Sequence, residues 1–354
     1  MFWLLTIFLF FPLIALAVNR DVKISNQIGL LALFLLLLIF GFNNGNHDYK
    51  PYVEIFNDPE GYAEFGYVLL VEFVKFIGGG HSTLVLIVGG FLTLSLLRAA
   101  ISFKVNISIL CILYFIYPFI FDITQIRNTI MFCFALNGMV SAYEERWVRS
   151  FLFILLGACF HNFGLIYILV IFIYKFYSRD LIKIFLLGLV LMVVLPFTLS
   201  YLLPFINIGR VNSLVYSYLS DTIKLKSILI WGLDYFLFIF VAYNLRKHIL
   251  IQPSLLCGDF KKIDFLFKIL IIHVVFLGFL MYFFEFNRVY RNAFILRYLF
   301  VGVCFPYISL NFRLLVVIYI FLNSLFFSYL SSINLEGSYD YFDILTSNYL
   351  LDLF

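Results

Sequence analysis

Charged residues are scarce in this chain. Asp, Glu, Lys and Arg make up 12% of its 354 residues, whereas soluble domains carry about 25%. Hydrophobic residues reach 64%, and the mean hydropathy is +1.04. These values exclude a soluble enzyme with one membrane anchor and predict an all-α polytopic integral membrane protein. The net charge of +4 is small and scattered, which argues against nucleic acid as a partner.

The chain also lacks paired cysteines and a metal-binding pattern. Its five cysteines include no CxxC pair, so we expect reduced, structural thiols. His161 has no second histidine at metal-ligand spacing, so no metal site is expected, and no cofactor is implied. The first residues lack the basic segment of a signal peptide, so we interpret residues 2–18 as a first transmembrane helix.

Apolar runs occur along the whole sequence. A spanning helix needs about 20 apolar residues, with a range of about 17–25, and the shorter runs are expected to end among neighbouring helices. The pattern predicts about 10–12 transmembrane helices in a single domain over residues 1–354. The clearest runs are 2–18, 28–42, 83–97, 106–121, 128–142, 181–196, 228–243, 264–284, 293–310 and 314–330.

Lysine and arginine predict the orientation of the chain, because they are enriched in cytoplasmic loops. With Arg20 and Lys23 in the cytoplasm, a basic loop over 244–263 is cytoplasmic as well. The polar loop 43–82 then faces outward and carries an amphipathic surface helix near 62–77. Both termini also face outward, as do loops 197–227 and 285–292.

Residues 150–174 fit two descriptions. One continuous helix would put His161 on its inner face and would place the cations that follow, Lys175, Arg179 and Lys183, outside. Two half-helices, 150–160 and 163–174, would keep those cations in the cytoplasm. We favour a hairpin broken at His161 and Asn162 on the charge rule, since irregular backbone at membrane depth is allowed where it is buried or lines a wet cavity.

Arg127 is the first candidate for a functional cation on the outward side. It opens an apolar run beside Gln125 and Asn128. An arginine at a helix N-terminus opposes the helix dipole, so capping does not explain it. An anionic ligand would explain it, and an ion pair with Asp122 is a compatible alternative.

Arg288 and Arg291 form a second group, because a spacing of three places them on one helix face. The planar guanidinium fork suits phosphate oxygens, which predicts a diphosphate clamp. The alternative is an ion pair with Glu285, or side chains that reach the lipid headgroups. For Arg297 we weigh a functional and a structural role equally. Arg210, in the outward loop 197–227, is a further candidate.

The remaining candidates are a histidine and an acidic, aromatic loop. A lone histidine on an apolar helix is usually a hydrogen-bonded core residue, but Asn162 and a nearby helix break favour a His161 that faces a cavity. Most carboxylates in loop 43–82 will simply be solvated. Carboxylates together with tyrosines nevertheless suit a carbohydrate, and the residues concerned include Asp48, Tyr49, Tyr52, Tyr62 and Tyr67. The other histidines, His47, His81, His248 and His273, are assigned no role.

In their order and spacing these motifs resemble the EpsG family of bacterial exopolysaccharide membrane proteins, which is related to Wzy-type polymerases. The resemblance covers most of the chain. It rests on Asp48 with Tyr52, on Glu64-Phe-Gly-Tyr67, on Gln125-Ile-Arg127-Asn128-Thr-Ile, on Phe160-His161, and on Asn287-Arg288-Val-Tyr-Arg291.

The resemblance implies a Wzy-type, GT-C-like helix bundle in the bacterial cytoplasmic membrane. Its activity would be a metal-independent glycosyltransferase that joins polyprenyl-diphosphate-linked repeat units of O-antigen, capsule or exopolysaccharide on the outer face. It leaves a chain-length regulator open as a partner. In this interpretation Arg127, Arg288, Arg291 and Arg210 bind the diphosphate, Tyr52, Tyr67 and Asn128 bind sugar, and His161, Asp48 and Glu64 are candidates for the general base. The alternatives are a flippase of lipid-linked oligosaccharides, which internal repeats would favour, and a membrane ligase or acyltransferase.

Overall fold

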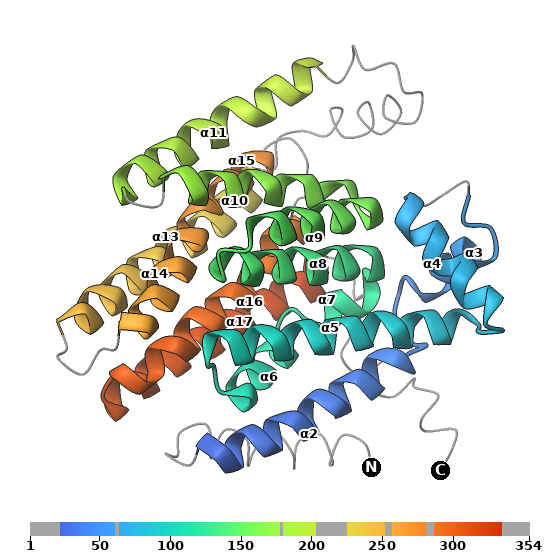
Figure 1. Ribbon diagram of the computed structural model, residues 1–354, viewed down its shortest axis with the longest axis horizontal. Helices are drawn as coiled ribbons and strands as arrows, with labels where there is room; N and C mark the ends of the chain where they lie inside the picture. The colour runs from blue at the N-terminus through green and yellow to red at the C-terminus, as the bar shows by residue number, and fades with distance from the viewer. Residues whose placement is uncertain are drawn as a thin grey trace. The chain divides into compact units, whose positions relative to one another are not determined.

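The computed structural model describes residues 22–60, 64–177, 180–202, 225–251, 257–280 and 287–334. Within these ranges the regular structure is helical (Figure 1). Four helical segments are long and apolar enough to cross a membrane, Val22–Gly41, His81–Phe103, Leu229–Leu250 and Leu310–Leu330. The prediction of an all-α polytopic membrane protein is confirmed. The predicted run 2–18 and Arg210 lie outside the described residues.

The chain forms two compact units. Unit 1 comprises residues up to Ile168 and from Val301 onward, and unit 2 comprises Leu169–Phe300. The helices of unit 1 are α2 (Val22–Gly41), α3 (Tyr49–Asn57), α4 (Phe65–Phe76), α5 (His81–Phe103), α6 (Ile107–Ile116), α7 (Phe119–Thr124), α8 (Ile126–Tyr143), α9 (Trp147–Phe160) and α17 (Leu310–Asn334). Those of unit 2 are α11 (Leu181–Leu202), α13 (Leu225–Leu250), α14 (Cys257–Ile272) and α15 (Val274–Phe279). The boundary between the units falls within α10 (Ile166–Tyr177) and α16 (Asn287–Cys304).

Helix α6 shows how the sequence sets the helix ends. The side chain of Asn106 accepts the backbone N–H of Ser108 at 2.9 Å, which caps the start of the helix. The helix ends at Ile116, two residues before Pro118, because the residue before a proline is disfavoured in the helical region. The predicted run 106–121 is therefore two helices, α6 and α7, and the run 264–284 is likewise divided at His273 into α14 and α15.

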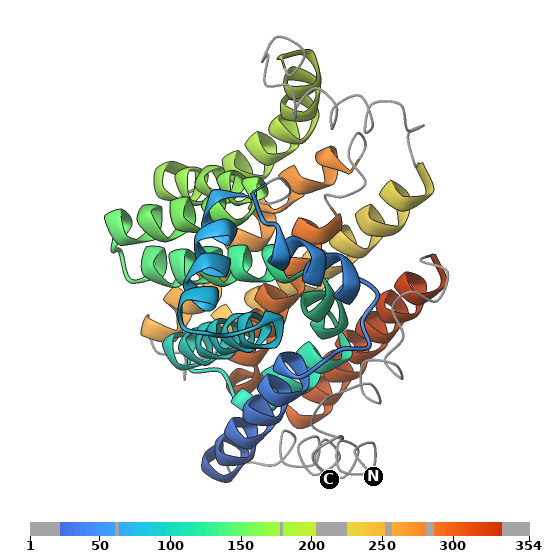
Figure 2. The same cartoon turned by 90° about the vertical axis from the view of Figure 1, so that its right-hand side faces the viewer.

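The centre of unit 1 is the antiparallel pair of α8 and α9. The two backbones come very close where a glycine removes the side chain, since a Cβ on Gly157 would lie 2.9 Å from the carbonyl oxygen of Met131. A Cβ on Gly138 would lie 3.1 Å from that of Ser150. Helices α3 and α4 cover the end of this pair at which α8 begins (Figures 1 and 2).

Residues 150–174 do not form one continuous helix. Helix α9 ends at Phe160, His161 has an extended backbone, and a 3-10 turn covers Asn162–Leu165 before α10 begins. The predicted break at His161 is therefore confirmed. The predicted turn at 122–128 is shorter than expected, because only Gln125 separates α7 from α8.

Candidate functional site

The start of α8 carries a cation bound to a carboxylate from a distant part of the sequence. An Nη atom of Arg127 lies 2.8 Å from Oε2 of Glu64, at the residue that precedes α4. About a quarter of the Arg127 side chain and a fifth of the Glu64 side chain remain exposed. The pair is therefore half-buried, and part of the guanidinium is accessible from outside.

Two tyrosine rings lie beside this ion pair. The guanidinium carbon of Arg127 lies 6.0 Å from the centre of the Tyr52 ring, which is within the range of a cation–π contact. The rings of Tyr52 and Tyr67 lie 6.3 Å apart. Asp48 precedes α3 by one residue and its carbonyl accepts the N–H of Tyr52, so it lies one helical turn from Tyr52 on the same face.

A close contact between helices holds Glu64 in place. A Cβ on Gly66 would lie 2.8 Å from the carbonyl oxygen of Cys159, so only a glycine lets the first turn of α4 approach the end of α9 this closely. Glu64 is two residues before this contact. The motif of a glutamate, any residue and a glycine thus has a physical reason, because the glycine positions the backbone that carries the carboxylate.

His161 belongs to the same end of unit 1. Arg127 lies four residues before Met131 in α8, and His161 lies four residues after Gly157. Since Met131 and Gly157 face each other in the antiparallel pair, this register places His161 level with Arg127. Nδ1 of His161 accepts the backbone N–H of Phe163 at 3.3 Å. In the neutral ring the proton therefore lies on Nε2, which becomes a hydrogen-bond donor.

Two predicted sugar-binding groups have polar atoms without partners. The hydroxyl of Tyr67 and Oδ1 of Asn128 are buried and form no hydrogen bond within the described residues. Burial also raises the pKa of Tyr67 well above its ordinary value, so this hydroxyl stays protonated. Because Tyr67 is 0% exposed and Asn128 3% exposed, a ligand group would have to enter the interior to bond them.

Asp122 stabilises the junction before α8. Its Oδ2 accepts the hydroxyl of Tyr114 at 2.8 Å, and its carbonyl accepts the hydroxyl of Thr129 at 2.8 Å. Both bonds are buried, so they join α6, α7 and the first turn of α8 into one support for Arg127.

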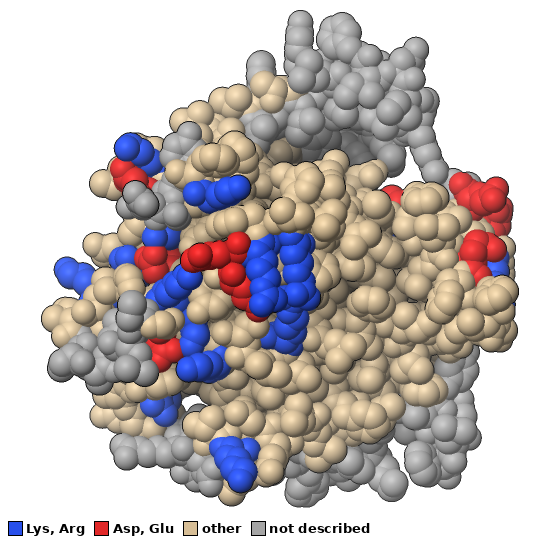
Figure 3. All heavy atoms as spheres, in the orientation of Figure 1, with Lys and Arg blue, Asp and Glu red and all other residues tan. Residues whose placement is uncertain are grey.

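The opposite end of α8 has a different character. There Arg98 donates to Asn137 at 2.7 Å, and Glu144 lies 3.7 Å from Arg98 and 3.3 Å from Arg146. Figure 3 shows mixed basic and acidic side chains over this end, and acidic ones over α3 and α4. With about 1.5 Å per residue, the 18 residues of α8 separate the two polar ends by about 27 Å, close to the bilayer's apolar thickness of about 30 Å.

The other predicted cations lie in unit 2 or outside the described residues. Helix α16 begins at Asn287, so Arg288 and Arg291 are helical, the first half-buried and the second 4% exposed. Arg297 is buried and its Nη1 lies 2.7 Å from Oδ2 of Asp234 on α13. Its guanidinium also lies 4.3 Å from the centre of the Phe294 ring.

The structure also buries a histidine that was assigned no role from the sequence. His81, at the first turn of α5, lies against α3, with its ring 5.2 Å from that of Tyr49 and 6.1 Å from that of Phe56. Neither ring nitrogen has a hydrogen-bond partner within the described part of the chain. Its position after Gly78-Gly79-Gly80 indicated a loop, and only the aromatic spacing of α3 could have indicated the contact. No cluster of three or more metal-ligating side chains occurs within the described residues.

Comparison with known proteins adds one finding. The profile of the EpsG family matches residues 27–343, nearly the whole chain. Neither the curated proteins nor the solved structures contain a match.

Proposed function

Because the chain belongs to the EpsG family, we propose that it polymerises lipid-linked oligosaccharide repeat units into a surface polysaccharide. The family identifies a membrane protein of polysaccharide biosynthesis. The finer activity is a metal-independent glycosyl transfer on the outer face of the bacterial cytoplasmic membrane, with a polyprenyl diphosphate as the leaving group.

The observation that carries this proposal is the cluster at the start of α8. It combines a half-buried guanidinium, a carboxylate at 2.8 Å and a tyrosine ring at 6.0 Å. Cations suit a diphosphate, and carboxylates with aromatic rings suit sugar hydroxyls and faces. The cluster also lies about a membrane thickness from the end of α8 near Arg98 and Arg146, and arginines there support an outward-facing cluster under the charge rule.

The reaction needs charge stabilisation and one proton acceptor. A hydroxyl at the non-reducing end of one chain attacks the anomeric carbon of another, and the bond from that carbon to the diphosphate oxygen breaks. Negative charge grows on the leaving diphosphate, where Arg127 stabilises it as a preorganised donor. Arg288, Arg291 and Arg210 are proposed as further ligands of the diphosphate.

Asp48 is the proposed general base among the three candidates. The Nδ1 of His161 already accepts a backbone N–H, so its Nε2 donates a hydrogen bond to a ligand oxygen. Glu64 is ion-paired with Arg127. If Glu64 took the proton, the ion pair that holds the guanidinium in position for the leaving group would be lost. Asp48 directly precedes α3 on the face that carries Tyr52, and a carboxylate beside a ring that can stack on a sugar is suited to take the proton.

Deletion of the gene, followed by a gel of the surface polysaccharide, tests the proposal. We expect single repeat units without the ladder of longer chains, and restoration of the ladder by the wild-type gene. If the single units were lost as well, the protein would be needed to export the units, and this result would contradict polymerisation.

Arginine variants test the diphosphate role in the same strain. Arg127→Ala should abolish the ladder while the protein still accumulates in the membrane. Arg127→Lys keeps the charge but loses the planar fork, so chains should be short. Arg149→Ala, an exposed residue at the start of α9, is the matched control and should leave chain length unchanged. Normal chains from Arg127→Ala would make this arginine structural.

A further inference from the structure

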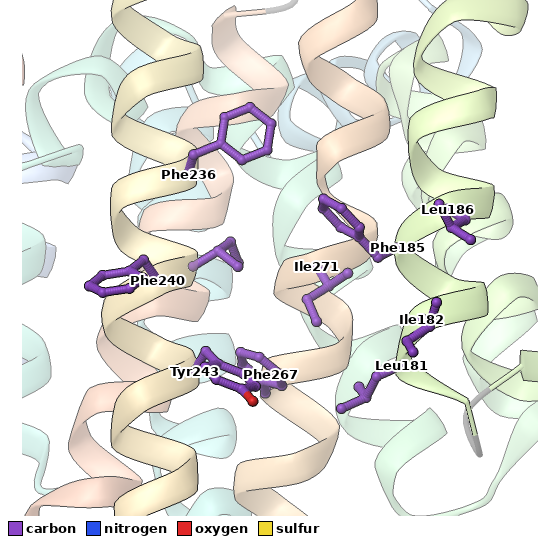
Figure 4. Close-up of a pocket in the computed structure, with 10 residues that line it drawn as sticks. Leu181, Ile182, Phe185, Leu186, Phe236, Phe240, Tyr243, Phe267 and Ile271 are labelled. Atoms are coloured by element: carbon purple, nitrogen blue, oxygen red, sulfur yellow. The ribbon is translucent and has the colours of Figure 1, made fainter.

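Unit 2 has an apolar groove that the proposed reaction does not use. It lies between α11 and α13, with α14 as its floor, and its volume is about 390 Å³. Figure 4 shows the side chains from the three helices that line it. The walls include Leu181, Phe185, Phe236, Phe240, Tyr243 and Ile271, and the lining is almost entirely apolar.

The groove leads to a basic end. Phe236, Phe240, Tyr243 and Lys247 follow one another along α13 at spacings of four, three and four residues, so they share a helix face. Lys247 is exposed and forms no ion pair within the described residues. It therefore lies one turn beyond the groove as a cation still available to a ligand.

More cations than carboxylates surround this end. At the start of α11, beside Leu181, Lys183 lies 3.3 Å from Asp180. On α14, Asp264 accepts a guanidinium N–H of Arg246 at 2.7 Å and also binds Lys268. Lys262 pairs with Asp259 on the same helix, so with Lys247 and Lys261 six cations surround three carboxylates at this end. The excess positive charge is complementary to a phosphate.

The groove is short relative to the membrane. From Phe236 to Tyr243 is seven residues, or about 10 Å of helix, which is a third of the apolar thickness of about 30 Å. It therefore accommodates part of one lipid chain in the leaflet at the basic end. The basic residues of α11, α13 and α14 are far apart in the sequence and share this end because α11 and α13 both pack against α14.

We propose that unit 2 binds an anionic glycerophospholipid, with one acyl chain in the groove and the phosphate at Lys247, at the basic end. A basic pocket beside membrane helices is a recurring site for anionic headgroups. The occupant is a membrane lipid that remains bound, distinct from the substrate of the reaction.

Lipid retention by the purified full chain tests this site. Detergent-purified protein is titrated with phosphatidylglycerol or phosphatidylcholine, and bound lipid is counted by native mass spectrometry. The wild type should retain one phosphatidylglycerol saturably. Lys247→Gln should lower its affinity about fivefold. Lys23→Gln, an exposed lysine on α2, removes the same charge elsewhere and should change nothing.

A second variant tests the groove itself. Ile239 also lines it, and Ile239→Trp should displace the chain and abolish retention of phosphatidylglycerol while the lysines remain. Equal retention of both lipids by the wild type would overturn the proposal. So would a tryptophan variant that binds normally, or displacement of phosphatidylglycerol by polyprenyl phosphate at equal concentration, which would make the carrier lipid the occupant.

Discussion

Arg127 is held from two sides by groups of different chemistry. A carboxylate 2.8 Å away neutralises part of its charge. A tyrosine ring 6.0 Å away limits the orientations of the guanidinium plane. An arginine held in this way loses little conformational freedom when it binds a ligand, because its rotamers are already limited. The same carboxylate lowers the cost of placing the cation near the membrane, so Glu64 acts on the ligand through Arg127.

The roles of Asp48 and Glu64 can be separated kinetically. Asp48→Asn should lower kcat by about a hundredfold or more, since a positioned general base contributes about 10²–10⁴-fold. Glu64→Gln keeps an oxygen that can accept from Arg127, so it should mainly raise KM for the diphosphate-linked donor. Chain extension by the purified protein in vesicles measures both constants. A collapse of kcat in Glu64→Gln with normal turnover in Asp48→Asn would reverse the assignment.

Arg297 is expected to stabilise unit 2, although the sequence left its role open. It is 1% exposed, and its partner Asp234 is 7% exposed. Removing one member leaves a buried charge without its partner, which costs about 3–5 kcal/mol. Arg297→Met should therefore lower the unfolding temperature of the purified protein sharply.

The double variant gives the control for this prediction. Replacing both members by apolar residues, Asp234→Leu with Arg297→Met, removes the unpaired charge, and it should recover most of the lost unfolding temperature. If Arg297→Met unfolds at the normal temperature and fails only in polymer synthesis, Arg297 would belong to the substrate site.

At the scale of helices, the site depends on how α4 approaches α9. The buried face of α4, with Tyr67, Val71 and Val74, packs inward, while large apolar side chains such as Phe73 and Phe76 are exposed. The helix predicted near 62–77 is therefore present as Phe65–Phe76, and its exposed apolar face suits a membrane surface. Its first turn then determines the position of Glu64.

A single methyl group should disturb this contact. Gly66→Ala would place a Cβ 2.8 Å from the carbonyl oxygen of Cys159, which is backbone and cannot rotate away, so we expect a cost of about 1–3 kcal/mol. Glu64 should withdraw from Arg127, and chain length should fall. Gly90→Ala is the matched control, because nothing lies within 4 Å of the added Cβ. Equal chain lengths in the two variants would remove Gly66 from the argument.

Across the whole molecule, composition was enough to predict the helical membrane class, because apolar runs and scarce charge have few other solutions. The positive-inside rule, with a polar pair that interrupts an apolar run, also predicted the break at His161. The helix breaks before Pro118 and at His273 were missed, since hydropathy alone does not record capping or backbone breaks. The family resemblance is confirmed by the match over residues 27–343.

The composition of the site was less predictable. Asp48, Tyr52, Glu64, Tyr67 and Arg127 were each candidates, and the structure brings them to one end of unit 1. The partner of Arg127 could not be read from the sequence, because Glu64 is 63 residues away and Asp122 is nearer in the chain. The contact of His81 with α3 was missed for the same reason, since it is tertiary. The sites proposed at Arg288, Arg291 and Arg210 stay predictions.

The orientation of the whole chain can be tested by labelling introduced cysteines. Cys159 is exposed and is first replaced by serine, together with Cys257. Glu72→Cys on the exposed side of α4 should then react with a membrane-impermeant maleimide in intact cells, because loop 43–82 is predicted to face outward. Asp180→Cys, before α11, should react only after the membrane is opened, because the lysines around it follow the charge rule. Labelling of both positions from outside would contradict the hairpin at 150–174, and labelling of Asp180→Cys alone would invert the molecule and place the Arg127 cluster on the cytoplasmic face.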